Sequence, residues 1–85
     1  MADYKDLDVW KKSIDFVEIV YKVVSSFPRK EIYAFSDQLK RVVVSIPSNI
    51  AEGASRNSNK EFVQFLYIVL GSASEVETQL IIAKD

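Results

Sequence analysis

The fold is decided by residues 62–83, which read FVQFLYIVLGSASEVETQLIIA. Apolar or small side chains recur there at alternating spacings of four and three residues, at Phe62, Leu66, Val69, Ala73, Val76, Leu80 and Ala83. This spacing predicts a helix with an unbroken apolar seam about 33 Å long. Ser58 and Glu61 form a capping-box pattern just before it, so we expect the helix over residues 59–84.

Two further helices are predicted upstream by the same periodicity. The first covers about residues 7–26 and ends before Pro28, because the residue preceding a proline is pushed out of the helical region. The second covers about residues 35–52, with Gly53 as its C-terminal stop. Pro47 should kink this helix, because proline lacks a backbone donor and clashes with the preceding turn. Its apolar stripe is Phe35, Leu39, Val43, Ile46 and Ile50.

All three helices have more apolar surface than one neighbour can cover. The first has two adjoining apolar stripes, and the third has a second apolar face at Val63, Tyr67, Leu70 and Ile81. Gly71 lies inside the third helix, either because another helix approaches closely or because the glycine is tolerated there. The sequence therefore predicts one all-α domain over residues 1–85, whose exposed apolar faces are covered by a fourth helix or by neighbouring subunits.

Composition points away from enzymes. The 85 residues include no cysteine and no histidine, which removes Ser-His and Cys-His pairs and makes a zinc site unlikely to form. The two glycines are 18 positions apart, so there is no glycine-rich phosphate loop. We expect a non-enzymatic protein without cofactor, metal or small-molecule substrate. A hydrolase using carboxylates from different helices remains the alternative.

The charge and hydropathy of the sequence limit the partners and the cellular location that we expect. The net charge is −1, which gives no general attraction to nucleic acid or to anionic membranes. The uncharged apolar runs fall short of the roughly 20 residues that span a bilayer, and the first residues do not resemble a signal peptide. A domain this small without disulfides or metal is typically stabilised by oligomerisation. We therefore expect a cytoplasmic homo-oligomer without membrane contact.

A polar stripe runs along the predicted second helix. Its members recur at spacings of three and four residues: Gln38, Arg41, Ser45, Asn49 and Glu52. One interpretation is a solvated face. The other is a seam against a neighbouring helix, because serine and asparagine are poor choices for an exposed helix interior. In the second case Arg41 could pair with a carboxylate such as Glu75 on the third helix.

Basic residues cluster near the predicted helix ends, at Arg29, Lys30, Lys40, Arg41, Arg56 and Lys60. They are either scattered solubilising charges or, if an assembly gathers them into one ring, contacts for phosphates of RNA or DNA. The sequence leaves both interpretations open.

Several segments resemble one known family. These are Leu7-Asp8-Val9-Trp10-Lys11-Lys12-Ser13, Gln38-Leu39-Lys40-Arg41, Ser45-Ile46-Pro47-Ser48-Asn49-Ile50-Ala51-Glu52-Gly53, Phe65-Leu66-Tyr67 and Gly71-Ser72. Together they are similar to the 23S rRNA intervening-sequence proteins, a bacterial four-helix-bundle family. Valines at positions 42 and 43 depart from the small residues common there, and members usually have a further C-terminal helix.

The resemblance implies an antiparallel, up-and-down four-helix bundle, with three helices in this sequence and the fourth missing or beyond residue 85. It also implies assembly into a ring, with a homopentamer favoured, and a scaffold or binding role that is poorly defined. The accessory variability protein of diversity-generating retroelements is similar in fold and binds nucleic acid. That relative implies an alternative role as an RNA- or DNA-binding accessory protein.

Overall fold

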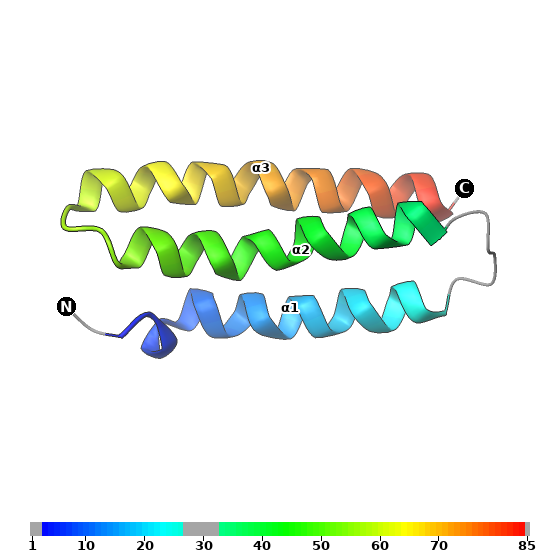
Figure 1. The fold of residues 1–85 in the computed structure, drawn as a ribbon, viewed down its shortest axis with the longest axis horizontal. Coiled ribbons are helices and arrows are strands. Elements are labelled where there is room, and N and C mark those ends of the chain that lie inside the picture. The colour runs from blue at the N-terminus through cyan, green and yellow to red at the C-terminus, as the bar shows by residue number, and fades with distance from the viewer. Residues whose placement is uncertain (1–2, 27–32, 85) are drawn as a thin grey trace.

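The computed structural model describes residues 3–26 and 33–84, and most of these residues are helical (Figure 1). A short 3₁₀ turn, η1 (Tyr4–Asp6), precedes α1 (Asp8–Ser25), α2 (Tyr33–Ala54) and α3 (Asn59–Lys84). Within the described ranges there are three α-helices and no strand, so the predicted all-α class is confirmed. The sequence pattern did not predict η1, and the connection over residues 27–32 lies outside the described residues.

The three helices form a layer with α2 in the middle (Figure 1). α2 runs antiparallel to both neighbours and packs against each of them. Among the described residues, α1 and α3 make no direct backbone approach to one another. The molecule is accordingly elongated, with extents of 45 × 20 × 16 Å. The structure thus has an open three-helix arrangement, and the predicted four-helix bundle is not complete in this chain.

The core lies along the inner face of α2. Leu39, Val43 and Ile50 of this helix are fully buried, together with Val20 of α1 and Val76 of α3. This confirms the apolar stripe predicted for α2. The heptad seam of α3 also packs where predicted, because its half-buried members lie against the core: Leu66, Val69, Ala73 and Leu80.

The start of α3 agrees with the predicted capping box. The amide of Glu61 donates to Ser58 Oγ at 3.2 Å, which satisfies one of the free donors of the first helical turn. The return contact differs from the usual pattern, since the Ser58 hydroxyl donates to the Glu61 carboxylate at 3.2 Å.

The end of α2 differs from the prediction. Gly53 is not a stop, because α2 continues through it to Ala54 and no described glycine has a positive φ. Gly53 lies instead at the crossing of α2 and α3, where an added Cβ would be 2.6 Å from Phe65 Cβ. Pro47 is buried inside α2, as predicted, and the ribbon of α2 changes direction near its middle (Figure 1).

Candidate interaction surface

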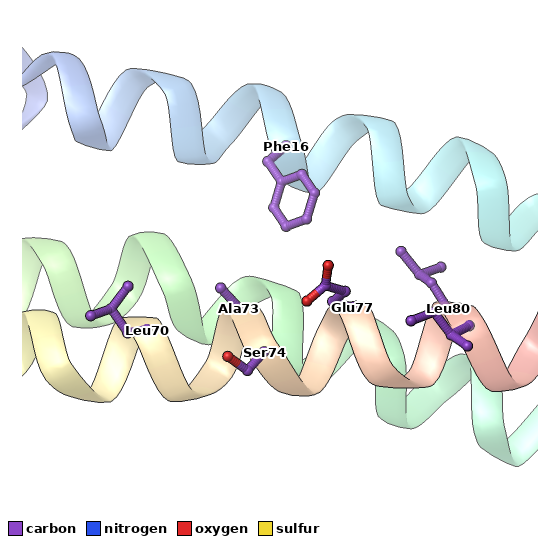
Figure 2. A pocket seen from close by; sticks show the side chains of 7 residues that line it. Phe16, Leu70, Ala73, Ser74, Glu77 and Leu80 are labelled. Carbon is purple, nitrogen blue, oxygen red and sulfur yellow. The ribbon is translucent and has the colours of Figure 1, made fainter.

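A groove lies between α1 and α3, the two helices that pack on α2 without approaching each other. It has a volume of about 610 Å³ and is lined by Phe16 of α1 and by Leu70, Ala73, Ser74, Glu77, Leu80 and Ile81 of α3. Figure 2 shows the Phe16 ring extending from α1 toward α3, with the Glu77 carboxylate directed to the same space. Apart from Ser74 and Glu77, the lining is apolar.

Both walls of this groove continue as regular stripes of exposed side chains. The α1 edge consists of Val9, Lys12, Phe16, Ile19 and Val23. The α3 edge consists of Val63, Tyr67, Leu70, Ser74, Glu77 and Ile81. Phe16 is half-buried, and every other member is exposed. Seven of the eleven exposed large hydrophobic side chains lie on these two edges, so they form the main uncovered apolar surface of the described chain.

A second, smaller groove lies between α1 and α2. It has a volume of about 330 Å³ and is lined by Tyr4, Trp10, Ile14, Val17, Val44, Pro47, Ser48 and Ala51. The turn η1 closes one end of it, because the Tyr4 ring packs edge-to-face on Trp10 with ring centroids 5.4 Å apart. Neither groove contains two acidic side chains, so neither supports a hydrolase with paired carboxylates.

The structure divides the predicted polar stripe of α2 into two parts. Gln38, Arg41 and Glu52 are exposed, whereas Ser45 and Asn49 are half-buried. A hydrogen bond of 2.9 Å links Ser45 Oγ to Ser72 Oγ on α3. Asn49 Nδ2 donates to the Ser45 carbonyl at 2.8 Å. Within the described residues, Ser45 therefore makes the polar contact between this stripe and α3, whereas Asn49 bonds its own helix.

The suggested pairing of Arg41 with Glu75 is wrong for the single chain. Arg41 Nη2 lies 3.3 Å from Asp37 Oδ2, one helical turn earlier, and the two side chains are 69% and 57% exposed. Arg41 Nη2 is also 3.5 Å from Gln38 Oε1. Glu75 instead accepts a hydrogen bond of 3.0 Å from Gln79 Nε2. A local i, i+4 pair is easier to form than one between helices, because the helix already places its partners side by side.

The basic residues with described side chains do not gather in one place. Lys40 Nζ lies 5.2 Å from the centroid of the Tyr21 ring. Arg56 is held by Glu52, with Nη2 and Oε2 2.9 Å apart, and its guanidinium lies 4.9 Å from the Phe65 ring centroid. Lys40 lies about 21 Å along the axis from the end of α2 at Ala54, at 1.5 Å per residue, and Arg56 lies in the turn beyond that end. Lys60 is exposed at the start of α3, and Arg29 and Lys30 lie outside the described residues.

The comparison with protein families identifies the chain's relatives. The model of the family described as 23S rRNA-intervening sequence protein matches residues 5–85. The chain belongs to this family. No curated protein matches it.

One of the segments that resemble the family, residues 45–53, builds the contact between α2 and α3. Over residues 45–53, Ser45 bonds Ser72, and Ile46 and Ile50 enter the core. Gly53 allows Phe65 to approach. The segment thus has a packing role in the described chain. Separately, no cluster of three metal-binding side chains occurs among the residues that the structure describes.

Two charged residues on the edges beside the groove, Lys12 on α1 and Glu77 on α3, were not predicted as site residues. The signal was present in the sequence, because each of them occupies a position in a run spaced by three and four residues: Val9, Lys12, Phe16, Ile19, Val23 and Val63, Tyr67, Leu70, Ser74, Glu77, Ile81.

The exposed pair of Arg41 and Asp37 leads to a prediction about stability. Arg41→Ala should change the free energy of unfolding by less than about 0.5 kcal/mol, because exposed i, i+4 pairs contribute little. Urea unfolding followed by circular dichroism measures it, with Asp37→Ala as the matched control. A loss above about 1 kcal/mol for Arg41→Ala alone would mean that a neighbouring chain covers this side chain.

Proposed function

We propose that this member of the 23S rRNA-intervening sequence family is a non-enzymatic subunit of a cytoplasmic homo-oligomer, acting as a scaffold or binding module. The observation that supports the proposal is the exposed apolar surface along the α1–α3 groove. A soluble monomer rarely exposes contiguous apolar patches of more than a few hundred Å². Burying such side chains contributes roughly 25 cal/mol per Å², which favours association over exposure.

The proposal includes the finer architecture. A further helix laid over the α1–α3 groove would contact both helices and convert the open layer into an antiparallel four-helix bundle. The resemblance of the sequence to the family supports assembly into a ring, with a pentamer favoured. The described basic side chains lie apart and the net charge is −1, so they give less support to binding of RNA or DNA.

The exposed surface has a second explanation in α3 itself. Residues Asn59–Ala83 are long and apolar enough to cross a membrane by length and composition, and almost none of this stretch is buried in the single chain. Glu75 and Glu77 make insertion costly, because a carboxylate at the bilayer centre is strongly disfavoured. The inner face of α3 also packs on α2. These two observations favour protein over lipid as the partner that covers the exposed surface of α3.

Size measurement tests the proposal. Sedimentation velocity or light scattering at micromolar concentration in detergent-free buffer should give a discrete mass that is a multiple of the 9.7 kDa chain. The mass should fall on dilution, because association follows mass action. A stable monomer at tens of micromolar would rule the proposal out, and recovery of the protein only in detergent would favour the membrane explanation.

A further inference from the structure

The turn η1 lies against the start of α1 and against α2, at one end of the smaller groove. We propose that η1 is a clasp. The contact between Tyr4 and Trp10 holds the first half of α1 (residues 8–16) on α2, and release of this contact lets the first half open while the second half stays packed. This motion takes place within one chain and does not depend on the proposed assembly.

The two halves of α1 are attached to the rest of the chain unequally. In the second half, Val20 and Val24 are buried and belong to the core cluster. Over the described residues 8–16, Ser13 alone is buried, and its hydroxyl donates to the Trp10 carbonyl at 2.6 Å within α1 itself. Because buried apolar contacts resist local opening, the first half is the part of α1 that separates at lower cost.

Packing between the first half of α1 and α2 is also incomplete. Trp10 and Ile14 are half-buried and line the groove of about 330 Å³, together with Pro47 and Ala51 of α2. Side chains that face unfilled space lose the dispersion contacts that a close-packed core supplies. Among the described residues, α1 makes no close backbone approach to α3 that would compensate.

The turn η1 supplies an attachment at this end of α1. The half-buried Tyr4 ring packs edge-to-face on Trp10, with ring centroids 5.4 Å apart and planes at 70°, and it lines the same groove. An edge-to-face pair together with the buried area of the ring corresponds to roughly a tenfold preference for the closed form.

The shape of η1 is fixed by hydrogen bonds within the turn. The Asp3 carboxylate accepts from the Lys5 amide at 2.9 Å. The Leu7 amide donates to the Tyr4 carbonyl at 3.1 Å, and the Leu7 side chain packs against the margin of the core. Because these contacts already order the turn, the Tyr4 ring loses little further freedom when it closes on Trp10.

Hydrogen exchange of the full chain tests the clasp, because backbone amides exchange when the helix that protects them opens. In Tyr4→Ala, the amides of residues 12–16 should exchange about tenfold faster than in the parent chain, whereas those of residues 20–25 should change less than about twofold. Trp10 is the one tryptophan in the sequence, so its fluorescence reports the same event. Its emission should move to longer wavelength as the indole ring loses cover.

Two variants serve as controls. Tyr4→Phe keeps the aromatic ring, so its exchange rates should stay within about twofold of the parent and its emission should not move. Tyr21→Ala removes the same side chain from the second half of α1, where Tyr21 is 41% exposed. It should leave the exchange of residues 12–16 unchanged. All variants are compared at one protein concentration, with circular dichroism showing that each keeps its helix content.

Two results would overturn the clasp. One is exchange of residues 12–16 in Tyr4→Ala that stays within about twofold of the parent, because the first half would then be held without the Tyr4 ring. The other is a uniform increase over α1, α2 and α3, because Tyr4 would then contribute to the global stability of the chain and not to a local opening. Neither result bears on the proposed homo-oligomer, which is tested by its mass.

Discussion

Ile50→Ala should lower the free energy of unfolding by about 3–4 kcal/mol. The Ile50 side chain has no exposed surface and belongs to the core that α2 forms with α1 and α3. Its truncation removes buried apolar surface and leaves a cavity in the core, which can collapse only partly. For a domain of this size, a loss of that magnitude is a large fraction of the total stability.

Urea unfolding at a fixed protein concentration measures the effect, since association contributes to apparent stability. Ile68→Ala is the matched control because Ile68 is 50% exposed on α3 and lies on neither edge. The same change in chemistry should cost less than about 1 kcal/mol there. Equal losses for the two variants would show that Ile50 is not the more deeply packed side chain.

Gly53→Ala should cost about 1–3 kcal/mol, although alanine is the better helix former. The added Cβ would lie 2.6 Å from Phe65 Cβ and 3.0 Å from a ring carbon of Phe62. A Cβ atom cannot swing aside as the end of a flexible side chain can, so α3 must move away from α2. The expected result is a lower melting temperature together with weaker packing between these two helices.

Gly71 provides a control for this prediction within the same chain. Gly71 also lies inside a helix, but an added Cβ would meet nothing within 4 Å. Gly71→Ala should therefore stabilise the chain by up to about 1 kcal/mol, through helix propensity alone. Stabilisation by both substitutions would contradict the close approach at Gly53. Loss of self-association in Gly71→Ala would instead show that another subunit approaches α3 at this glycine.

Helix positions and the core could be predicted because they depend on periodicity along the chain. The stripe containing Leu39, Val43 and Ile50 is buried as expected, and the capping pattern at Ser58 marks the start of α3. The end of α2 could not be predicted in this way. Glycine is the residue type that most often follows the end of a helix. The role of Gly53 depends instead on Phe65, a residue on another helix.

Side-chain partners were less predictable than helices. Arg41 had acceptors both on its own helix and on α3, and the sequence does not show which is nearer in space. The nearer one is Asp37. The groove between α1 and α3 was also beyond prediction, because helix faces were identified without the angles at which helices pack. The excess of apolar faces was nevertheless visible, and it is the feature on which the proposed function depends.

The order of the helices in the layer affects how the chain folds. Among the three described α-helices, the close backbone approaches join neighbours in the sequence, α1 with α2 and α2 with α3. Such a chain has low contact order, and helical domains of this kind fold within microseconds to milliseconds. During synthesis, α1 and α2 can pair before α3 leaves the ribosome. Misfolding then becomes a risk mainly when a newly released α3 must find α2 of its own chain before it meets another nascent chain.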